Sequence, residues 1–148
     1  MKKLFLIFPV YTLLILILGC GSSIHTVNFY LQCDNDCNDN NAVVVKIYQL
    51  KNADKFRYAS FESLMKNTEA TIGDDLIPNS KYEKTLVPGE TYRLKEIEIK
   101  NDALFLGVVG DFFSPAKDGW MQVIPIDSDL ENIEIIIHKN SLSFQNKD

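Results

Sequence analysis

Apolar and polar residues alternate along several short segments of the chain, and this alternation predicts β-strands. In residues 26–32, Val27, Phe29 and Leu31 fall on one face, which is the two-residue period of a half-buried strand. Residues 43–50 (VVVKIYQL) are rich in β-branched side chains and only partly alternate, a pattern that favours a strand buried on both faces. These two segments are the expected first and second strands.

Further apolar segments predict the remaining strands, separated by short polar turns. A change of phase between Leu94 and Ile97 predicts a β-bulge near Lys95, and the two glycines of the following segment indicate close packing or a bend. Turns are expected at Pro88-Gly89 and Asn101-Asp102. The expected strands are 92–100, 103–113, 120–126, 133–138 and a short last one around 142–144.

One segment has a helical period. Phe61, Leu64 and Met65 stand at i, i+3 and i+4, and Ser60 precedes them as an N-cap. So short a helix must pack on another element, because one or two turns are not stable alone. Short, regularly spaced strands without a strand–helix–strand rhythm predict an all-β fold, namely an antiparallel two-sheet β-sandwich with a short helical insertion.

The N-terminal segment has neither pattern. Two lysines follow Met1, an almost unbroken apolar run fills residues 4–18, and Gly19 and Cys20 come next, which is typical of a targeting segment. A helix of that run would be about 22 Å long, short of the ~30 Å hydrocarbon core, so a permanent transmembrane helix is the weaker interpretation.

The end of this run, Ile17-Leu18-Gly19-Cys20, resembles the lipobox of bacterial lipoproteins. The resemblance implies a signal peptide at 1–19, lipid attachment at Cys20 as the first mature residue, a lipidated tether at 20–25 and a periplasmic domain at 26–148. Gly21 is similar to the residue found there in proteins sorted to the outer membrane. The alternative is a soluble signal peptide with a chance cysteine.

Removal of residues 1–19 would leave 13 basic and 20 acidic residues, a formal charge of −7. Such a surface repels nucleic acid and anionic lipid, so the acyl chains would be the main membrane contact. Lipidation of Cys20 also accounts for the odd number of cysteines, leaving Cys33 and Cys37 as a pair.

The two remaining cysteines are candidates for a disulfide. Residues four apart in a strand are about 13 Å apart, whereas a disulfide needs Cα atoms within about 7 Å. A Cys33–Cys37 bond would therefore force the chain to turn at residues 34–36. We expect this bond, with two free thiols as the alternative.

Catalytic and metal-binding patterns are weak. The two histidines, His25 and His138, stand in no catalytic or metal-ligand spacing, and Asp74-Asp75 is more simply a solvated turn. We expect no enzyme activity and no cofactor.

The acidic segment 33–41 (CDNDCNDNN) places Asp34, Asp36 and Asn38 at positions 1, 3 and 5 of a calcium loop. Asp39 then stands where glycine is needed, and Val45 where the bidentate glutamate is needed. Weak calcium binding stays open, but we expect a solvated connecting loop, because Asn and Asp favour turns. Such loops at the end of a sandwich often carry partner contacts.

Residues 43–65 (VVVKIYQLKNADKFRYASFESLM) resemble the outer-membrane lipoproteins of the type VI secretion system, the TssJ family. Four further segments support the resemblance in the family's order: GDDL at 73–76, LVPGETYRL at 86–94, FLGVVGDFFSPAKDGWMQVIPI at 105–126 and IEIIIHKNSLSF at 133–144. The resemblance implies a transthyretin-like sandwich with a small helical insertion, held at the inner leaflet of the outer membrane.

The resemblance also implies a protein partner, the C-terminal periplasmic region of the system's large inner-membrane subunit. The family's contact element maps to residues 33–41, which here are short, not Pro-rich, and carry two cysteines. The implied partner-binding residues are Asp34, Asn35, Asp36, Asn38, Asp39 and Asn40. The alternative function is a periplasmic lipoprotein that binds a small ligand or glycan, which would need a concave apolar pocket with convergent polar groups.

Overall fold

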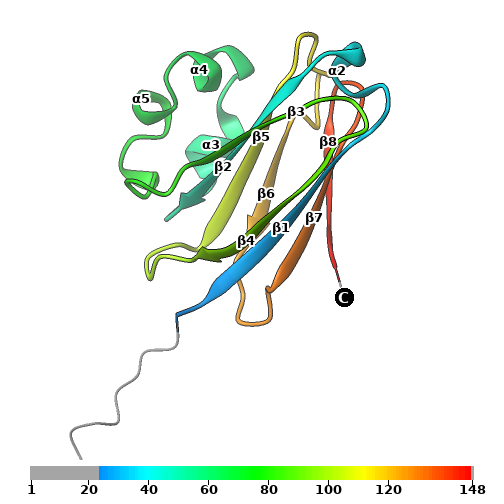
Figure 1. Ribbon diagram of the computed structural model, residues 1–148. Helices are drawn as coiled ribbons and strands as arrows, with labels where there is room; N and C mark the ends of the chain where they lie inside the picture. Colours follow the sequence, from blue (N-terminus) through cyan, green and yellow to red (C-terminus); the bar gives the residue numbers. More distant parts are fainter. Residues whose placement is uncertain (1–23, 148) are drawn as a thin grey trace, which may run out of the picture.

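Two four-stranded sheets pack face to face over residues 24–147, the part of the chain that the computed structural model describes (Figure 1). The first sheet has the order β4 (Thr91–Glu98), β1 (Thr26–Cys33), β7 (Asn132–Ile137) and β8 (Leu142–Asn146). The second has the order β3 (Tyr82–Leu86), β2 (Val43–Leu50), β5 (Phe105–Asp111) and β6 (Met121–Pro125). The expected two-sheet sandwich is confirmed. Cys20 and the expected signal peptide lie outside the described residues.

The alternation seen in the sequence decides which side chains fill the core. Every second residue of β1 and β7 points inward, where contact with the opposite sheet removes it from water. The buried residues of these strands are Val27, Phe29, Leu31, Cys33, Ile133, Ile135 and Ile137. Burial of each large apolar side chain contributes about 1.5–3 kcal/mol to folding, so the register of both strands is strongly fixed.

The first sheet is not wholly antiparallel, contrary to the expectation from the sequence. β1 pairs antiparallel with β4 but parallel with β7, from Asn28 opposite Asn132 to Cys33 opposite Ile137. A parallel pair needs a long crossover, and here almost the whole domain lies between the two strands. Local patterns carry no information about such a pairing.

The bulge expected near Lys95 is confirmed. Val27 lies opposite Ile97 and Phe29 opposite Leu94, so β4 has one extra residue at this point. Glu96 takes a left-handed conformation (φ 56°), and its backbone N–H donates to the side-chain oxygen of Asn28 at 3.1 Å. The bulge keeps the apolar residues on both sides of it on the core face.

Three short helices and a 3-10 turn connect β2 to β3 and cover the outer face of the second sheet (Figure 1). They are α3 (Asp54–Tyr58), α4 (Phe61–Lys66), α5 (Thr68–Ile72) and η1 (Gly73–Asp75). The expected cap is confirmed, because Ser60 Oγ accepts from the backbone N–H of Ser63 at 3.2 Å. Helices α3 and α5 and strand β3 were not predicted, since each has only five residues and shows little periodicity. No helix within residues 24–147 is long and apolar enough to cross a bilayer.

The helical insertion explains why β2 is buried on both faces. Phe56 of α3 is fully buried and its ring lies edge-on to Tyr48 of β2, with centroids 6.3 Å apart. A Cβ atom at Gly107 of β5 would lie 2.7 Å from the Phe56 ring, so only glycine allows this close approach. The expectation of close packing is therefore confirmed at Gly107.

Candidate partner-binding surface

The loop expected to bind a partner follows β1 at the end of the sandwich opposite to Thr26, where the described domain begins (Figure 1). The eight residues of β1 at about 3.3 Å each separate these two ends by about 25 Å. Strand pairing places Leu86 and Asp111 beside the start of β2, so the connections after β3 and β5 emerge here too. We call residues 34–42, 87–90, 112–120 and 138–141 together the distal end.

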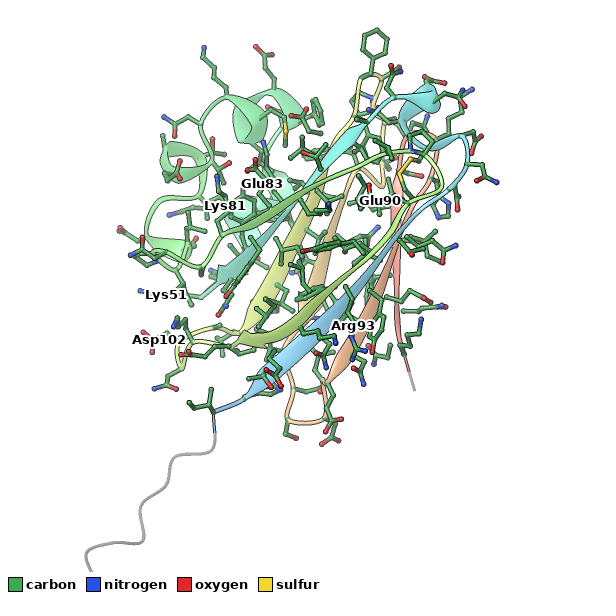
Figure 2. All side chains as sticks on the ribbon, viewed as in Figure 1. Lys51, Lys81, Glu83, Glu90, Arg93 and Asp102 are labelled. Carbon is green, nitrogen blue, oxygen red and sulfur yellow. A yellow bond between two sulfur atoms is a disulfide. The ribbon has the colours of Figure 1, made fainter. Side chains whose placement is uncertain are left out.

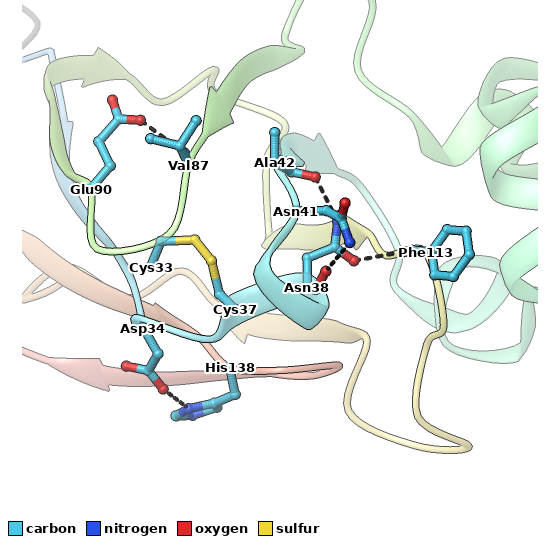
Figure 3. The surroundings of a disulfide bond; sticks show 10 residues. All are labelled: Cys33, Asp34, Cys37, Asn38, Asn41, Ala42, Val87, Glu90, Phe113 and His138. Atoms are coloured by element: carbon cyan, nitrogen blue, oxygen red, sulfur yellow. Dashed lines mark hydrogen bonds and ion pairs between the residues drawn. A yellow bond between two sulfur atoms is a disulfide. The ribbon is translucent and has the colours of Figure 1, made fainter.

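A disulfide closes the first turn of this loop. Cys33 and Cys37 are bonded, with their Cα atoms 5.7 Å apart, and both are buried. The carbonyl of Asp34 accepts from the backbone N–H of Cys37 at 3.1 Å, so the chain turns in the segment where such a bond requires it. The N–H of Gly89 points at the carbonyls of Cys33 and Asp34, both at 3.2 Å, which fixes the loop to the β3–β4 connection. Figure 3 shows the disulfide with its surroundings.

Removal of the disulfide is expected to destabilise the domain. Replacement of both Cys33 and Cys37 by serine should lower the free energy of unfolding by about 2 kcal/mol, the chain-entropy value for so small a loop. Urea unfolding followed by circular dichroism measures this difference. The wild-type protein unfolded in the presence of a reductant is the control and should match the double variant, whereas an unchanged urea midpoint in both would show that the bond does not stabilise the fold.

The turn labelled α2 (Cys37–Asn40) has a left-handed backbone at Asn38, Asp39 and Asn40, with φ values of 48°, 54° and 63°. Asn and Asp occupy this region more readily than other non-glycine residues because their short polar side chains bond locally. This preference explains why a run of Asn and Asp forms the tip of the loop.

Asn38 faces inward, although the family resemblance implies it as a partner-binding residue. Its side chain is only 3% exposed. The side-chain oxygen accepts from the backbone N–H of Phe113 at 2.7 Å, and the amide nitrogen donates to the carbonyl of Ala42 at 2.5 Å. Asn38 therefore joins the loop to the β5–β6 connection (Figure 3) and positions its neighbours.

The other implied residues lie at the surface. Asn35, Asp36 and Asn40 are exposed, while Asp34 and Asp39 are partly buried. Asp39 pairs with Lys139 at 3.1 Å. The exposed part of the loop therefore presents amide groups to solvent. It also presents the carboxylate of Asp36, for which the described residues provide no partner.

Asp34 belongs to a hydrogen-bonded series that sequence reasoning did not detect. His138 Nδ1 lies 2.7 Å from Asp34 Oδ2, and His138 Nε2 lies 2.9 Å from Ser143 Oγ. The order of groups is that of a hydrolase triad, but such catalysis also needs an oxyanion hole and a substrate cleft. Two surface hollows of about 370 and 550 Å³ lie elsewhere, beside Tyr30 and beside Tyr48. The series connects the loop to the ends of β7 and β8.

Two apolar side chains are exposed at the distal end, and neither was predicted as a site residue. Phe113 is 81% exposed and Val87 is 53% exposed. The backbone N–H of Val87 donates to the carboxylate of Glu90 at 3.0 Å; Glu90 is labelled in Figure 2. Lys84 pairs with the same carboxylate at 3.2 Å. These two interactions hold the pKa of Glu90 below its usual value and fix the backbone that presents Val87.

The calcium-loop spacing does not form a cation site within residues 24–147, where no group of three or more His, Cys, Asp or Glu side chains is suited to hold a metal ion. Asp34 is engaged by His138, and the side-chain oxygen of Asn38 by Phe113. The side-chain oxygens of Asp34 and Asn38 therefore bind different protein groups and do not converge on one point.

Residues 25–140 match the family model described as type VI secretion lipoprotein, with the member names VasD, EvfM and TssJ. No curated protein matches the sequence.

Several solved structures share the fold. The T6SS lipoprotein TssJ1 from Pseudomonas aeruginosa has a TM-score of 0.76 and 21% identity, covering 84% of this chain and 98% of that one. Serratia marcescens Lip, a membrane-bound component of the type VI secretion system, has a TM-score of 0.74 and 18% identity, covering 84% and 99%. A chain in the structure named "T6SS protein TssM C-terminal domain (869-1107) from EAEC" has a TM-score of 0.67 and 24% identity, covering 81% and 97%.

Proposed function

The chain belongs to the family of type VI secretion lipoproteins, and we propose that it is a lipid-anchored subunit that tethers TssM, the system's large inner-membrane subunit, to the outer membrane. The family consists of structural lipoproteins, not enzymes. The resemblance seen in the sequence is thereby confirmed. In this proposal residues 1–19 are removed, Cys20 carries the lipid in the inner leaflet of the outer membrane, and residues 26–148 lie in the periplasm.

The observation that carries the proposal is the geometry of β1, whose start lies near the proposed lipid attachment site in the sequence and whose end leads into the proposed partner-binding loop. Thr26, the first residue of β1, lies six residues after the proposed lipid attachment site. Cys33, its last residue, begins the loop that the disulfide closes. The sandwich therefore acts as a rigid spacer that holds the distal end about 25 Å from the end nearest the lipid. This arrangement suits a bridge between a membrane and a second protein.

The proposed partner rests on one of the structural matches. That structure is named after a segment of TssM that runs from 869 to 1107, yet 81% of this chain aligns with 97% of the matched chain. The matched chain is thus much shorter than the named segment, which supports the interpretation that a chain of this fold accompanies TssM there. We propose the corresponding C-terminal periplasmic region as the partner here.

Binding of a small ligand or glycan is less well supported. The buried side chains of the two sheets fill the space between them. The hollow beside Tyr30 lies on the outer face of the first sheet, and Arg93 and Lys147 are among the residues that line it. Both this hollow and the larger one beside Tyr48, which Glu69 and Lys81 help to line, are open to solvent and bordered by charged side chains, whereas such a function requires a concave apolar pocket.

A binding measurement tests the proposal. The detergent-solubilised lipoprotein should bind the purified C-terminal periplasmic region of TssM, and a variant with serine at Asn35, Asp36 and Asn40 should bind at least tenfold more weakly. These three residues are exposed, so the fold should be retained, with a loss of only about 1 kcal/mol of stability from the left-handed backbone at Asn40. The matched control replaces Asn101 and Asp102, exposed residues of a turn at the opposite end, and should bind like the wild type. Absence of binding by the wild type would refute the proposed function.

A further inference from the structure

Phe113 is an exposed aromatic residue held by a rigid backbone. Its neighbour Phe112 is buried, and a Cβ atom at Gly110 would lie 2.5 Å from the Phe112 ring, so this ring is tightly confined. The N–H of Phe113 donates to the buried side-chain oxygen of Asn38 at 2.7 Å. Further along the same connection, Ala116 donates its N–H to the carbonyl of Asn140 at 3.0 Å. The phenyl ring of Phe113 therefore points into solvent from a fixed position.

The position of Phe113 within the distal end places it beside the loop implicated in partner binding. β2 lies between β3 and β5, so Val87 and Phe113, which follow these two neighbouring strands, flank Ala42 at the start of β2. Figure 3 shows Val87 and Phe113 on opposite sides of Ala42 and Asn41. Two exposed apolar side chains thus border the polar tip of the loop.

We infer that Phe113 is the aromatic anchor of the partner interface, inserting its ring into an apolar pocket of the C-terminal periplasmic region of TssM; this inference rests on the proposed function. Interface energy concentrates in a few central residues, aromatic ones prominent among them, surrounded by polar contacts that exclude water. Val87 extends the apolar centre, and Asn35, Asp36 and Asn40 form a polar rim. The partner surface then has a pocket of phenyl size bordered by amide or basic groups.

The rigid presentation of Phe113 strengthens this assignment. A side chain on a mobile loop must be ordered on binding, which costs conformational entropy. Three features fix the backbone of Phe113 before the partner binds. They are the hydrogen bond to Asn38, the disulfide of the same loop and the confined ring of Phe112. The exposed ring is therefore preorganised for insertion.

Substitution of Phe113 tests the inference. With the full lipoprotein in detergent and the purified periplasmic region of TssM, Phe113→Ala should raise the Kd roughly 30-fold or more, as expected for a central aromatic residue. The matched control is Tyr58→Ala, because Tyr58 is 88% exposed but lies on helix α3, away from the distal end; its Kd should stay within twofold. Thermal unfolding of both variants should match the wild type.

A second measurement does not depend on how well the variant folds. A photo-crosslinking phenylalanine analogue at position 113 should crosslink to TssM in cells, and the same analogue at position 58 should not. A Phe113→Ala variant with wild-type Kd, or no crosslink from position 113 while wild-type protein binds TssM, would overturn the assignment and leave the proposed function intact. Failure of the wild-type protein to bind would instead refute the proposed function.

Discussion

A Cys20→Ser variant should lose its attachment to the outer membrane while its sandwich stays folded. Each buried methylene of an acyl chain contributes about 0.8 kcal/mol to membrane partitioning, and stable anchoring takes more than one chain. The serine hydroxyl cannot replace the thiol that the lipobox resemblance assigns to lipid transfer. Within residues 24–147 the core begins at Val27, so we expect folding not to depend on Cys20. Fractionation of the envelope should find the variant soluble or retained at the inner membrane.

Two measurements separate lipidation from other effects of this substitution. The Cys33→Ser/Cys37→Ser variant also replaces cysteine by serine but keeps Cys20, so it should stay in the outer-membrane fraction. Mass spectrometry of the wild-type N-terminal peptide should show acyl groups on Cys20, and the purified Cys20→Ser variant should bind the TssM region in solution. Recovery of the variant in the outer-membrane fraction at the wild-type level would contradict the proposed anchor.

An Asn38→Ala variant should lose about 2–4 kcal/mol of the free energy of unfolding. Alanine in a left-handed conformation costs about 1 kcal/mol more than asparagine. Loss of the side chain also removes the partners of the Phe113 N–H and the Ala42 carbonyl, and leaving such partly buried groups unpaired costs about 1–3 kcal/mol. Urea unfolding measures the sum.

Asn40→Ala is a matched control for this variant. Asn40 has nearly the same left-handed backbone, with φ 63°, but its side chain is exposed. Replacement of Asn40 by alanine should therefore lower the free energy of unfolding only by the cost of the left-handed backbone, about 1 kcal/mol. Equal destabilisation by the two substitutions would show that the buried hydrogen bonds of Asn38 contribute nothing.

The local patterns of the sequence were sufficient to locate most strands. Alternation identified β1 because one face of that strand meets the core, and a run of β-branched residues identified β2, which is covered on both faces. A change of phase identified the bulge at Glu96, because the apolar residues on either side of it face the same core. The cap at Ser60 was visible because it depends on residues close in sequence. The family resemblance added the architecture, which short-range patterns do not contain.

The features that the sequence did not reveal depend on residues far apart in the chain. The parallel pairing of β1 with β7 brings Asp34 to His138, and their sequence separation hides this contact. Asn38 looked like its exposed neighbours in a polar run, yet its side chain is buried against the β5–β6 connection. Phe113 continued an apolar segment, and only the end of β5 at Asp111 shows that its ring is exposed.

The central position of β1 determines how the domain would respond to mechanical load. When lipid holds the Thr26 end and a partner holds the Cys33 end, a pull across the envelope acts along the axis of this strand. Its hydrogen bonds to β4 and β7 run across that axis, so they are sheared together instead of being unzipped one after another, as they would be in a strand peeled from a sheet edge. With the anchor and the partner contact where we propose them, the load would fall along the direction in which the central strand is held by hydrogen bonds on both sides.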